Sequence, residues 1–362
     1  MQYLHHRFII SSKIFCFNSA LSSNRMSKFF LLYNVILVAV YSAILYFRFT
    51  DKSPKKLQAV NNVVLILQLI SYICTFFCNI ISNWLNSKKL YTCLKKLTTI
   101  DENLIKFGAY LDHKKINLHF NISFFMAISL FSYVAIADYV FDVVVDKNIT
   151  LEVWLSVYVP LTVNYFSCYF IVLSLYLLHV RYSLLVKFLK NILQQGIFPG
   201  EDLSVVKSFV LMFMKMINVT NSMIPQFSLQ ICTMFILTFI TLTNNLYLLM
   251  KDLMFLHAIE IVLIVWAHYQ IHLKVNTIFG WAPQLMSINC SLQNHSYELM
   301  ECYLLIDKNK LDVQVFGMFT VDPSTLLAVT TWIVSYLIIM IQFTPENYKP
   351  DSSNWLMRSP TT

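Results

Sequence analysis

Residues 322–343 read DPSTLLAVTTWIVSYLIIMIQF. Asp322 is suited to cap the start of a helix, and Pro323 suits the first helical position, where a missing backbone N–H costs nothing. About 20 uncharged residues then follow, which is roughly the length of helix that crosses the hydrocarbon core of a bilayer. The stretch therefore predicts a membrane-spanning helix.

An ordered polar pattern lies inside this apolar stretch. Ser335-Tyr336 is followed by five hydrophobic residues and then by Gln342-Phe343. Positions seven apart lie nearly on one helix face, so Ser335 and Gln342 share a stripe, with Tyr336 and Phe343 on the neighbouring one. Lipid offers no partner to a hydroxyl or an amide, so this face should meet protein or water.

The pattern resembles the end of insect gustatory receptors, whose last membrane helix carries Thr-Tyr, five hydrophobic residues and Gln-Phe. Ser335 stands here in place of the threonine and keeps its hydroxyl. The run from Val315 to Asp322, VFGMFTVD, resembles the short apolar and glycine-containing approach to that helix. The resemblance covers the whole chain in organisation and residues 315–343 in motif.

The composition is that of a multispanning membrane protein. Of 362 residues, 57% are hydrophobic and 13% are charged, and the apolar residues gather in long runs with few charges. The net charge of +8 is scattered along segments that flank these runs, so binding to nucleic acid is not indicated. Seven spans are predicted, at residues 29–47, 59–85, 116–140, 153–178, 227–249, 256–273 and 322–343.

The longer connecting segments should form helices outside the bilayer. In residues 88–115 the apolar positions recur at helical spacing; they are Leu90, Leu94, Leu97, Leu104 and Ile105. Residues 203–226 form a second amphipathic helix that leads into the fifth span, and a further long helical segment follows the sixth span to about residue 315. The sequence thus predicts an all-α fold of seven spans with a helical anchor layer on one side of the membrane.

Basic residues predict which side that is. The N-terminal segment and the long connections, taken as one side, hold 19 of the 27 lysines and arginines, which places them in the cytosol and the C-terminus outside. The predicted division is a cytosolic segment 1–28, spans one to six with their extensions at 29–273, an anchor segment 274–321, the last helix 322–343 and an outer tail 344–362. All eight cysteines fall in spans or cytosolic segments, so no disulfide is expected in an outer loop.

Catalysis and resident cofactors find no support. The sequence holds no phosphate-binding glycine loop, nucleophile elbow or metalloprotease motif. His268 and His272 are four residues apart, yet no acidic or thiol partner completes a metal site, and a structural hydrogen-bonding role is favoured. No enzyme activity, cofactor or metal is expected.

Polar groups within the outer halves of the spans are the candidates for ligand binding, because hydrocarbon penalises them. They are Gln68, Tyr72, Tyr133, Asp138, Trp154, Tyr158, Asn164, Tyr165, Glu260 and Trp266. Trp154 and Tyr158 also suit an interfacial aromatic belt that needs no ligand. For Asp138 and Glu260, a pocket role and a structural hydrogen-bonding role are about equally supported.

The resemblance implies a ligand-gated, non-selective cation channel. Four subunits of this family surround a central pore lined by the last helix, as a homotetramer or with related receptors. Its expected pore and gate residues here are Ser335, Tyr336, Ile338, Ile339, Gln342 and Phe343. For Ser335 and Gln342, hydrogen bonding between helices is the simpler alternative.

The expected partners are a small-molecule tastant, permeating Na, K or Ca ions and membrane lipid, at the plasma membrane of chemosensory neurons. The competing interpretations are an odorant-receptor-type channel, a G-protein-coupled receptor, which needs the opposite orientation, and a secondary transporter, which the absence of glycine-interrupted repeats argues against.

Overall fold

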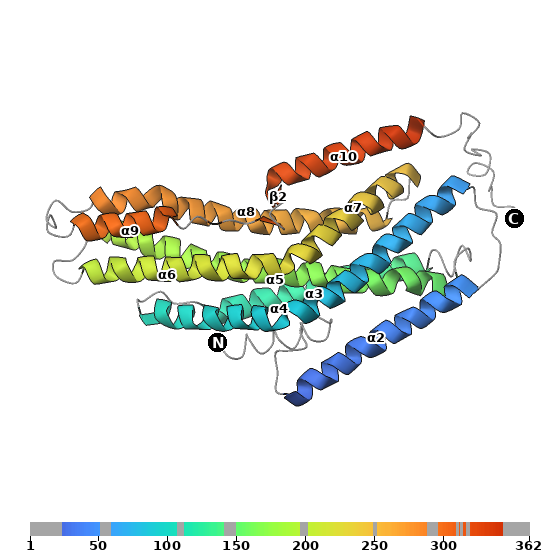
Figure 1. Ribbon diagram of the computed structural model, residues 1–362, viewed down its shortest axis with the longest axis horizontal. Coiled ribbons are helices and arrows are strands. Elements are labelled where there is room, and N and C mark those ends of the chain that lie inside the picture. The colour runs from blue at the N-terminus through green and yellow to red at the C-terminus, as the bar shows by residue number, and fades with distance from the viewer. Residues whose placement is uncertain are drawn as a thin grey trace, which may run out of the picture.

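Long helices make up nearly all of the described molecule (Figure 1). This computed structural model describes residues 24–50, 59–106, 112–140, 150–195, 202–248, 252–287, 296–308, 311, 314–315 and 319–342. The elements are α2 Asn24–Thr50, α3 Ala59–Lys106, α4 His113–Asp138, α5 Leu151–Gln195, α6 Asp202–Met223, the 3-10 turn η2 Ile224–Phe227, α7 Ser228–Leu248, α8 Asp252–Ser287, α9 Ser296–Lys308, β1 Gln314–Val315, β2 Phe319–Thr320 and α10 Pro323–Gln342. Helices α5, α6, α8 and α9 lie along the long axis of the molecule, and α2, α7 and α10 are inclined to it (Figure 1).

Each of the seven predicted spans corresponds to one helix, to within two residues at the ends of α4, α7 and α10: the helices are α2, α3, α4, α5, α7, α8 and α10. In the described chain, five helical segments are long and apolar enough to cross a membrane, while the apolar parts of α2 and α10 are the shorter stretches Asn34–Tyr46 and Pro323–Ile339. The cap at residue 322 is confirmed, because Asp322 Oδ1 accepts a hydrogen bond from the Thr325 backbone N–H at 3.2 Å. Among the described residues, the fold is all-α apart from one short strand pair.

The second predicted span and the charged segment after it form one unbroken helix. α3 runs for 48 residues, and its extension buries the leucines at positions 90, 94, 97 and 104. The prediction that Ile105 lies on the same face is wrong, since its side chain is 39% exposed. Ile105 follows Leu104 directly and so points about 100° away from it around the helix.

A buried ion pair joins the extensions of α3 and α5. Arg181 Nε and Nη2 donate to the two carboxylate oxygens of Asp101 at 2.8 and 2.6 Å, and Nη1 donates to the Leu177 carbonyl at 2.8 Å. Two parallel bonds are the geometry in which a guanidinium binds a carboxylate most strongly. The two long helices are thereby fixed against each other outside the predicted spans.

Helix α9 lies against α6 and α8 at the end of the molecule away from α10 (Figure 1). An exposed salt bridge, Lys207 Nζ to Glu298 Oε2 at 2.7 Å, connects α6 to α9. Toward the other end of α6, Thr220 shares a buried hydrogen bond of 2.9 Å with Tyr182 of α5. We call this bundle of α6, α9 and the adjoining ends of α3, α5 and α8 the anchor layer.

The chain after α9 corrects the prediction of a helix continuing to residue 315. Helix α8 ends at Ser287, α9 ends at Lys308, and β1 and β2 form an antiparallel pair in which Val315 lies opposite Phe319. Val315 and Val321 are buried in the main core, and the Phe319 ring lies 5.7 Å from Phe235 of α7. Alternating apolar residues that pack from a short strand resemble one turn of an amphipathic helix, which misled the sequence prediction.

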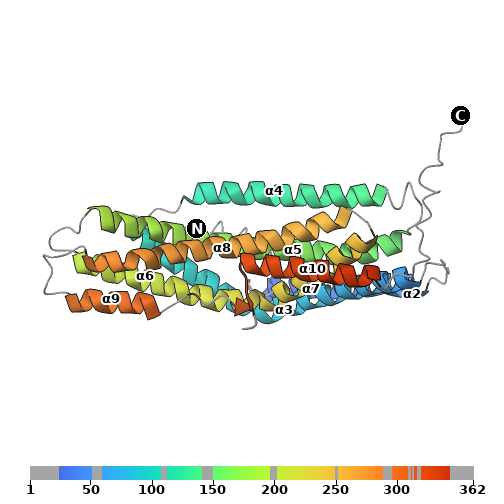
Figure 2. The same cartoon turned by 90° about the horizontal axis from the view of Figure 1, so that it is seen from above.

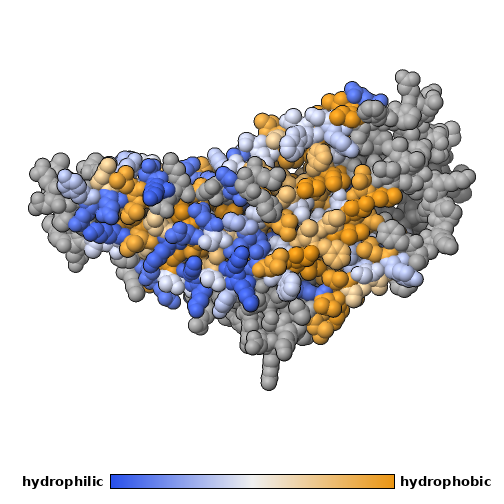
Figure 3. Space-filling model, in the orientation of Figure 1, coloured by the Kyte–Doolittle hydropathy of each residue, from blue (hydrophilic) through white to orange (hydrophobic). Residues whose placement is uncertain are grey.

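The surface separates into two halves. The face shown in Figure 3 is largely hydrophobic over the half that holds α2, α7 and α10, and more hydrophilic over the half that holds the anchor layer. Helix α4 lies along one side of the bundle as a layer of its own (Figure 2), and 11% of the span within it is buried. This division is the one expected when one half is in lipid and the other in water.

Candidate functional site

A chain of hydrogen bonds crosses the hydrophobic half of the bundle from α3 to α8. Gln68 Nε2 lies 3.4 Å from the Tyr72 hydroxyl, which lies 3.3 Å from His257 Nε2. His257 Nδ1 lies 3.0 Å from Glu260 Oε2. The arrangement suits a neutral imidazole that donates from Nδ1 to the carboxylate and accepts the tyrosine proton at Nε2.

A second polar contact lies beside this chain, between α4 and α5. The Tyr158 hydroxyl donates to Asp138 Oδ2. Trp154 stacks on the Tyr158 ring with centroids 4.3 Å apart, and Tyr139 meets Trp154 edge-on at 5.3 Å. Asp138, at the end of α4, is therefore held against an aromatic wall formed by the first turns of α5.

Aromatic packing unites these two groups. Tyr72 and Tyr158 belong to one buried cluster with Phe131, Leu161 and Leu237, and Trp154 and Tyr165 pack against it. The Tyr165 ring lies 5.1 Å from that of Phe131. We call the set of Gln68, Tyr72, Asp138, Trp154, Tyr158, Tyr165, His257 and Glu260 the polar–aromatic cluster.

Two buried polar atoms of this cluster have no hydrogen-bond partner within the described chain. They are Glu260 Oε1, an acceptor, and Trp154 Nε1, a donor. Leaving such a group unpaired costs about 1–3 kcal/mol, so each gains from meeting a complementary group. An acceptor and a donor beside aromatic rings are the elements of a site for a small, partly polar organic molecule.

Three predicted ligand residues lie outside this cluster. Tyr133 and Trp266 are 72% and 55% exposed and point out of the bundle. Asn164 is fully buried, but its Oδ1 accepts from Asn79 Nδ2 of α3 at 2.5 Å. Of the neighbouring residues Val265 and Trp266, it is Val265 that is buried. The position of a residue along a span is therefore easier to predict from the sequence than the side of the helix on which it lies.

Sequence reasoning missed His257. It is fully buried and connects Tyr72 to Glu260. A signal was present, because His257 and Glu260 are three apart in the otherwise apolar stretch 253–267, and residues at that spacing lie side by side on a helix. A buried carboxylate within lipid needs a partner, and the histidine one turn away is the nearest candidate.

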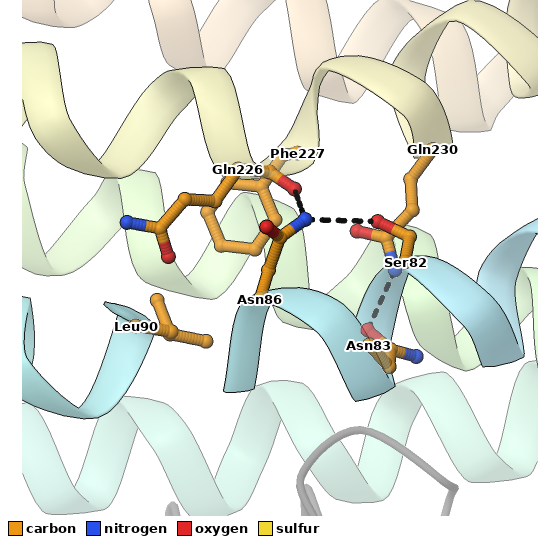
Figure 4. Close-up of a pocket in the computed structure, with 7 residues that line it drawn as sticks. All are labelled: Ser82, Asn83, Asn86, Leu90, Gln226, Phe227 and Gln230. Atoms are coloured by element: carbon orange, nitrogen blue, oxygen red, sulfur yellow. Dashed lines mark hydrogen bonds between the residues drawn. The ribbon is translucent and has the colours of Figure 1, made fainter. Parts of the chain in front are cut away.

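A cluster of amide side chains surrounds a small cavity where α3 meets η2 and α7 (Figure 4). Asn86 Nδ2 donates to the Gln226 backbone carbonyl at 2.9 Å, and Gln230 Nε2 donates to Asn83 Oδ1 at 2.7 Å. Ser82, Leu90 and Phe227 complete the lining. None of these residues was a predicted site residue.

These amides compensate for a break in the helical hydrogen-bond ladder. Pro225 has no N–H, and η2 replaces i→i−4 bonds with the tighter i→i−3 pattern. Gln226 Nε2 donates to the Ser222 carbonyl at 2.6 Å. The Gln226 backbone carbonyl in turn accepts a hydrogen bond from the Asn86 side chain of α3. The joint between α6 of the anchor layer and α7 is therefore held by side chains.

The polar stripe of α10 points away from the rest of the described chain. Helix α10 packs on α7 and α8 through a face that includes the buried Ile333. At about 100° per residue, Ser335, Ile339 and Gln342 lie within about 60° of one another on the opposite face. All three are exposed.

The other predicted gate residues surround this stripe. Ser335 Oγ donates to the Thr331 carbonyl of its own helix at 2.9 Å. Ile338 is exposed, and the Tyr336 ring lies 5.8 Å from Phe239 of α7, at the edge of the packed face. Phe343 lies outside the described residues. Among the described residues, Ser335 makes no hydrogen bond to another helix.

Comparison with known proteins agrees with this architecture. The model of a family described as 7tm Chemosensory receptor matches residues 3–347. The chain belongs to this family. The resemblance noted for the last helix is thereby confirmed at the level of insect chemosensory receptors.

A solved structure supports the fold of this chemosensory receptor. It is the insect olfactory receptor OR5 from Machilis hrabei in complex with eugenol, which matches with a TM-score of 0.67 at 14% identity, over 95% of this chain and 100% of that one. Among curated protein sequences, none matches. The receptor is thus a polytopic, seven-helix membrane protein of a receptor family.

Proposed function

We propose that this chemosensory receptor is a tastant-gated, non-selective cation channel of the gustatory type. The channel would lie in the plasma membrane of chemosensory neurons. The observation that carries the proposal is the α10 stripe: Ser335 and Gln342 lie in an apolar helix and yet face away from the rest of the described chain. Polar groups exposed at that depth need water or another subunit, and a pore ringed by four copies supplies both.

The proposed pore has an amide ring next to a hydrophobic constriction. Four Gln342 amides would replace part of the hydration of passing Na, K or Ca ions without binding any of them tightly. Rings of Ile339 and Phe343 would exclude water when narrow, with Ile338 and Tyr336 supporting the wall. A dewetted constriction blocks ions without any charged barrier.

The polar–aromatic cluster is the proposed site for the ligand. Five helices, α3, α4, α5, α7 and α8, contribute to it and its aromatic packing. Helices α7 and α8 are also those on which α10 packs. A small molecule that separates or draws together these helices would therefore move the support of the pore helix.

Recordings of Gln342 variants test the channel. The receptor, expressed in cells that lack related receptors, is challenged with a panel of sugars, bitter compounds and volatile odorants. Gln342→Glu should shift the reversal potential under biionic conditions toward that of divalent cations, because a carboxylate ring raises the local cation concentration. Gln284→Glu, which makes the same change at an exposed position outside the pore helix, should have no effect. Currents indistinguishable between Gln342→Glu and the parent would reject this pore.

The same recordings separate the alternatives. A response to volatile compounds alone would favour the odorant-receptor type, whose last helix lacks the Gln-Phe ending seen at Gln342-Phe343. A response that requires G proteins and carries no current of its own would favour a G-protein-coupled receptor.

A further inference from the structure

The exposed face of α3 changes character abruptly along its length. Ile81, Trp84 and Leu85 are 47%, 60% and 63% exposed, although they are large and hydrophobic. One turn further on, the same face begins to carry lysines, at Lys88 and Lys89. An exposed face that is apolar on one side and cationic on the other, with a tryptophan at the boundary, marks a membrane surface.

Four lysines share this face. At about 100° per residue, Lys88, Lys89, Lys95 and Lys96 fall within an arc of about 120°. The opposite side of the helix carries the buried Leu90, Leu94 and Leu97. All four lysines are exposed, and none of them forms a salt bridge with a described residue.

The lysines form two tiers at different depths. Lys88 lies about 5 Å beyond Leu85 along the helix, and Lys95 lies about 10 Å beyond Lys88. The headgroup region on each side of a bilayer is roughly 5–8 Å thick. With Leu85 placed at the edge of the hydrocarbon core, the first tier lies among the lipid phosphates, and the second lies about 10 Å beyond the first, on the aqueous side of the headgroups. Glu102, nearly two turns beyond the second tier, is the first acidic side chain near this face.

We propose that this face of α3 binds the headgroup of a phosphoinositide in the cytoplasmic leaflet. The phosphodiester would meet Lys88 and Lys89, while the phosphates on the inositol ring, which project from the bilayer, would meet Lys95 and Lys96. Clusters of four to eight cations directly after a membrane helix are the sequence feature that attracts such lipids. The proposal rests on the cytosolic placement of the anchor layer.

Lipid binding can be measured on the whole receptor without any current. The purified protein is titrated in detergent with short-chain phosphatidylinositol 4,5-bisphosphate, and bound lipid is counted by native mass spectrometry. The fourfold variant K88Q/K89Q/K95Q/K96Q should raise the dissociation constant at least tenfold. The corresponding arginine variant should keep the affinity, and raised salt should weaken it, because the attraction is between charges.

A matched control removes four other exposed lysines, as K187Q/K190Q/K215Q/K308Q. It lowers the net charge equally and should retain binding. Melting curves of both variants without added lipid verify that each is folded. Phosphatidylserine should bind more weakly, since it offers no charge to the second tier, and free inositol trisphosphate more weakly still, since it has no acyl chains to hold it at the membrane surface.

Three results would overturn the proposal: equal affinity of the fourfold variant and the parent, an equal loss in the control variant, or binding of free inositol trisphosphate as tight as that of the lipid. Each is independent of channel activity. A receptor that binds the lipid but carries no current would refute the proposed function and leave this inference standing.

Discussion

The ion pair between Arg181 and Asp101 shows how one contact can fix the relation of two long helices. Its side chains are 8% and 0% exposed, and three hydrogen bonds satisfy the guanidinium from both sides. Removing one charge from a pair buried this deeply leaves the other without a partner, which is costlier than removing both.

We therefore expect Arg181→Leu to destabilise the anchor layer by about 3–5 kcal/mol, with a clear fall in the melting temperature. The double variant Asp101→Leu/Arg181→Leu should recover most of the loss, because no buried charge remains. Thermal melts followed by size-exclusion chromatography measure both. Lys207→Leu, which breaks the exposed pair with Glu298, is the control and should melt like the parent. A double variant less stable than Arg181→Leu would contradict this account.

The unpaired Glu260 Oε1 leads to a prediction about ligand sensitivity. Glu260→Gln keeps the size of the side chain and removes its charge, so the ligand concentration for half-maximal current should rise roughly ten- to hundredfold, the range expected for loss of a hydrogen bond to a charged group. Maximal current should stay near the parent value. Dose–response recordings measure this.

Asp138→Asn should act in the same direction as Glu260→Gln. Glu301→Gln, at an exposed carboxylate of α9, is the control and should leave the response unchanged. If the Glu260 and Asp138 variants both keep the parent dose dependence, these carboxylates are structural and the ligand binds elsewhere.

Among the elements, η2 is the joint between the anchor layer and the helices that support α10. Helices α3 and α5 pass from one half of the molecule to the other as single helices, whereas the path from α6 to α7 is broken at Pro225. Any change in the angle of α7 can therefore be taken up at η2, where Asn86 and Gln226 supply the missing hydrogen bonds.

Asn86→Leu should loosen this joint. The Gln226 carbonyl loses its partner from α3, at a cost of about 1–3 kcal/mol, and α7 is held less firmly in the position found here. We expect a higher current in the absence of ligand, measured as leak relative to the maximal response. Asn218→Leu, at an exposed amide of α6, should leave the leak unchanged. An unaltered leak in Asn86→Leu would show that η2 does not move in gating.

Some helices and strands were predicted from the sequence, and others were not. The spans followed from hydropathy, and α10 begins at the predicted proline, because length and capping are local properties of the chain. The pair β1 and β2 was missed, since its support is a contact between Phe319 and the distant Phe235. Which helices become neighbours also determines that Tyr133 and Trp266 face outward and that His257 bonds to Tyr72. A single sequence does not show which helices pack together.

For the whole molecule, the distribution of charge makes a prediction about orientation. The segments that build the anchor layer and the N-terminal segment hold most of the basic residues, so the anchor layer should lie in the cytosol. Epitope tags at the two termini, probed on intact and permeabilised cells, decide this. The C-terminal tag should be accessible on intact cells and the N-terminal tag only after permeabilisation. The reverse pattern would contradict both the predicted topology and the proposed channel.

Helix α4 has an unusual dependence on its surroundings. Its polar contacts with α5 include Ser123 with the Tyr169 hydroxyl at 3.0 Å and Asp138 with Tyr158, and 11% of its span is buried. Lipid tails are as apolar as the side chains of the bundle. The hydrophobic effect therefore does not drive α4 onto the other helices within a bilayer. We therefore expect the surrounding lipid to help hold α4 in place. Delipidation by a harsh detergent should unseat α4 first, and a preparation could then lose Asp138 from the ligand site while its anchor layer still appears intact.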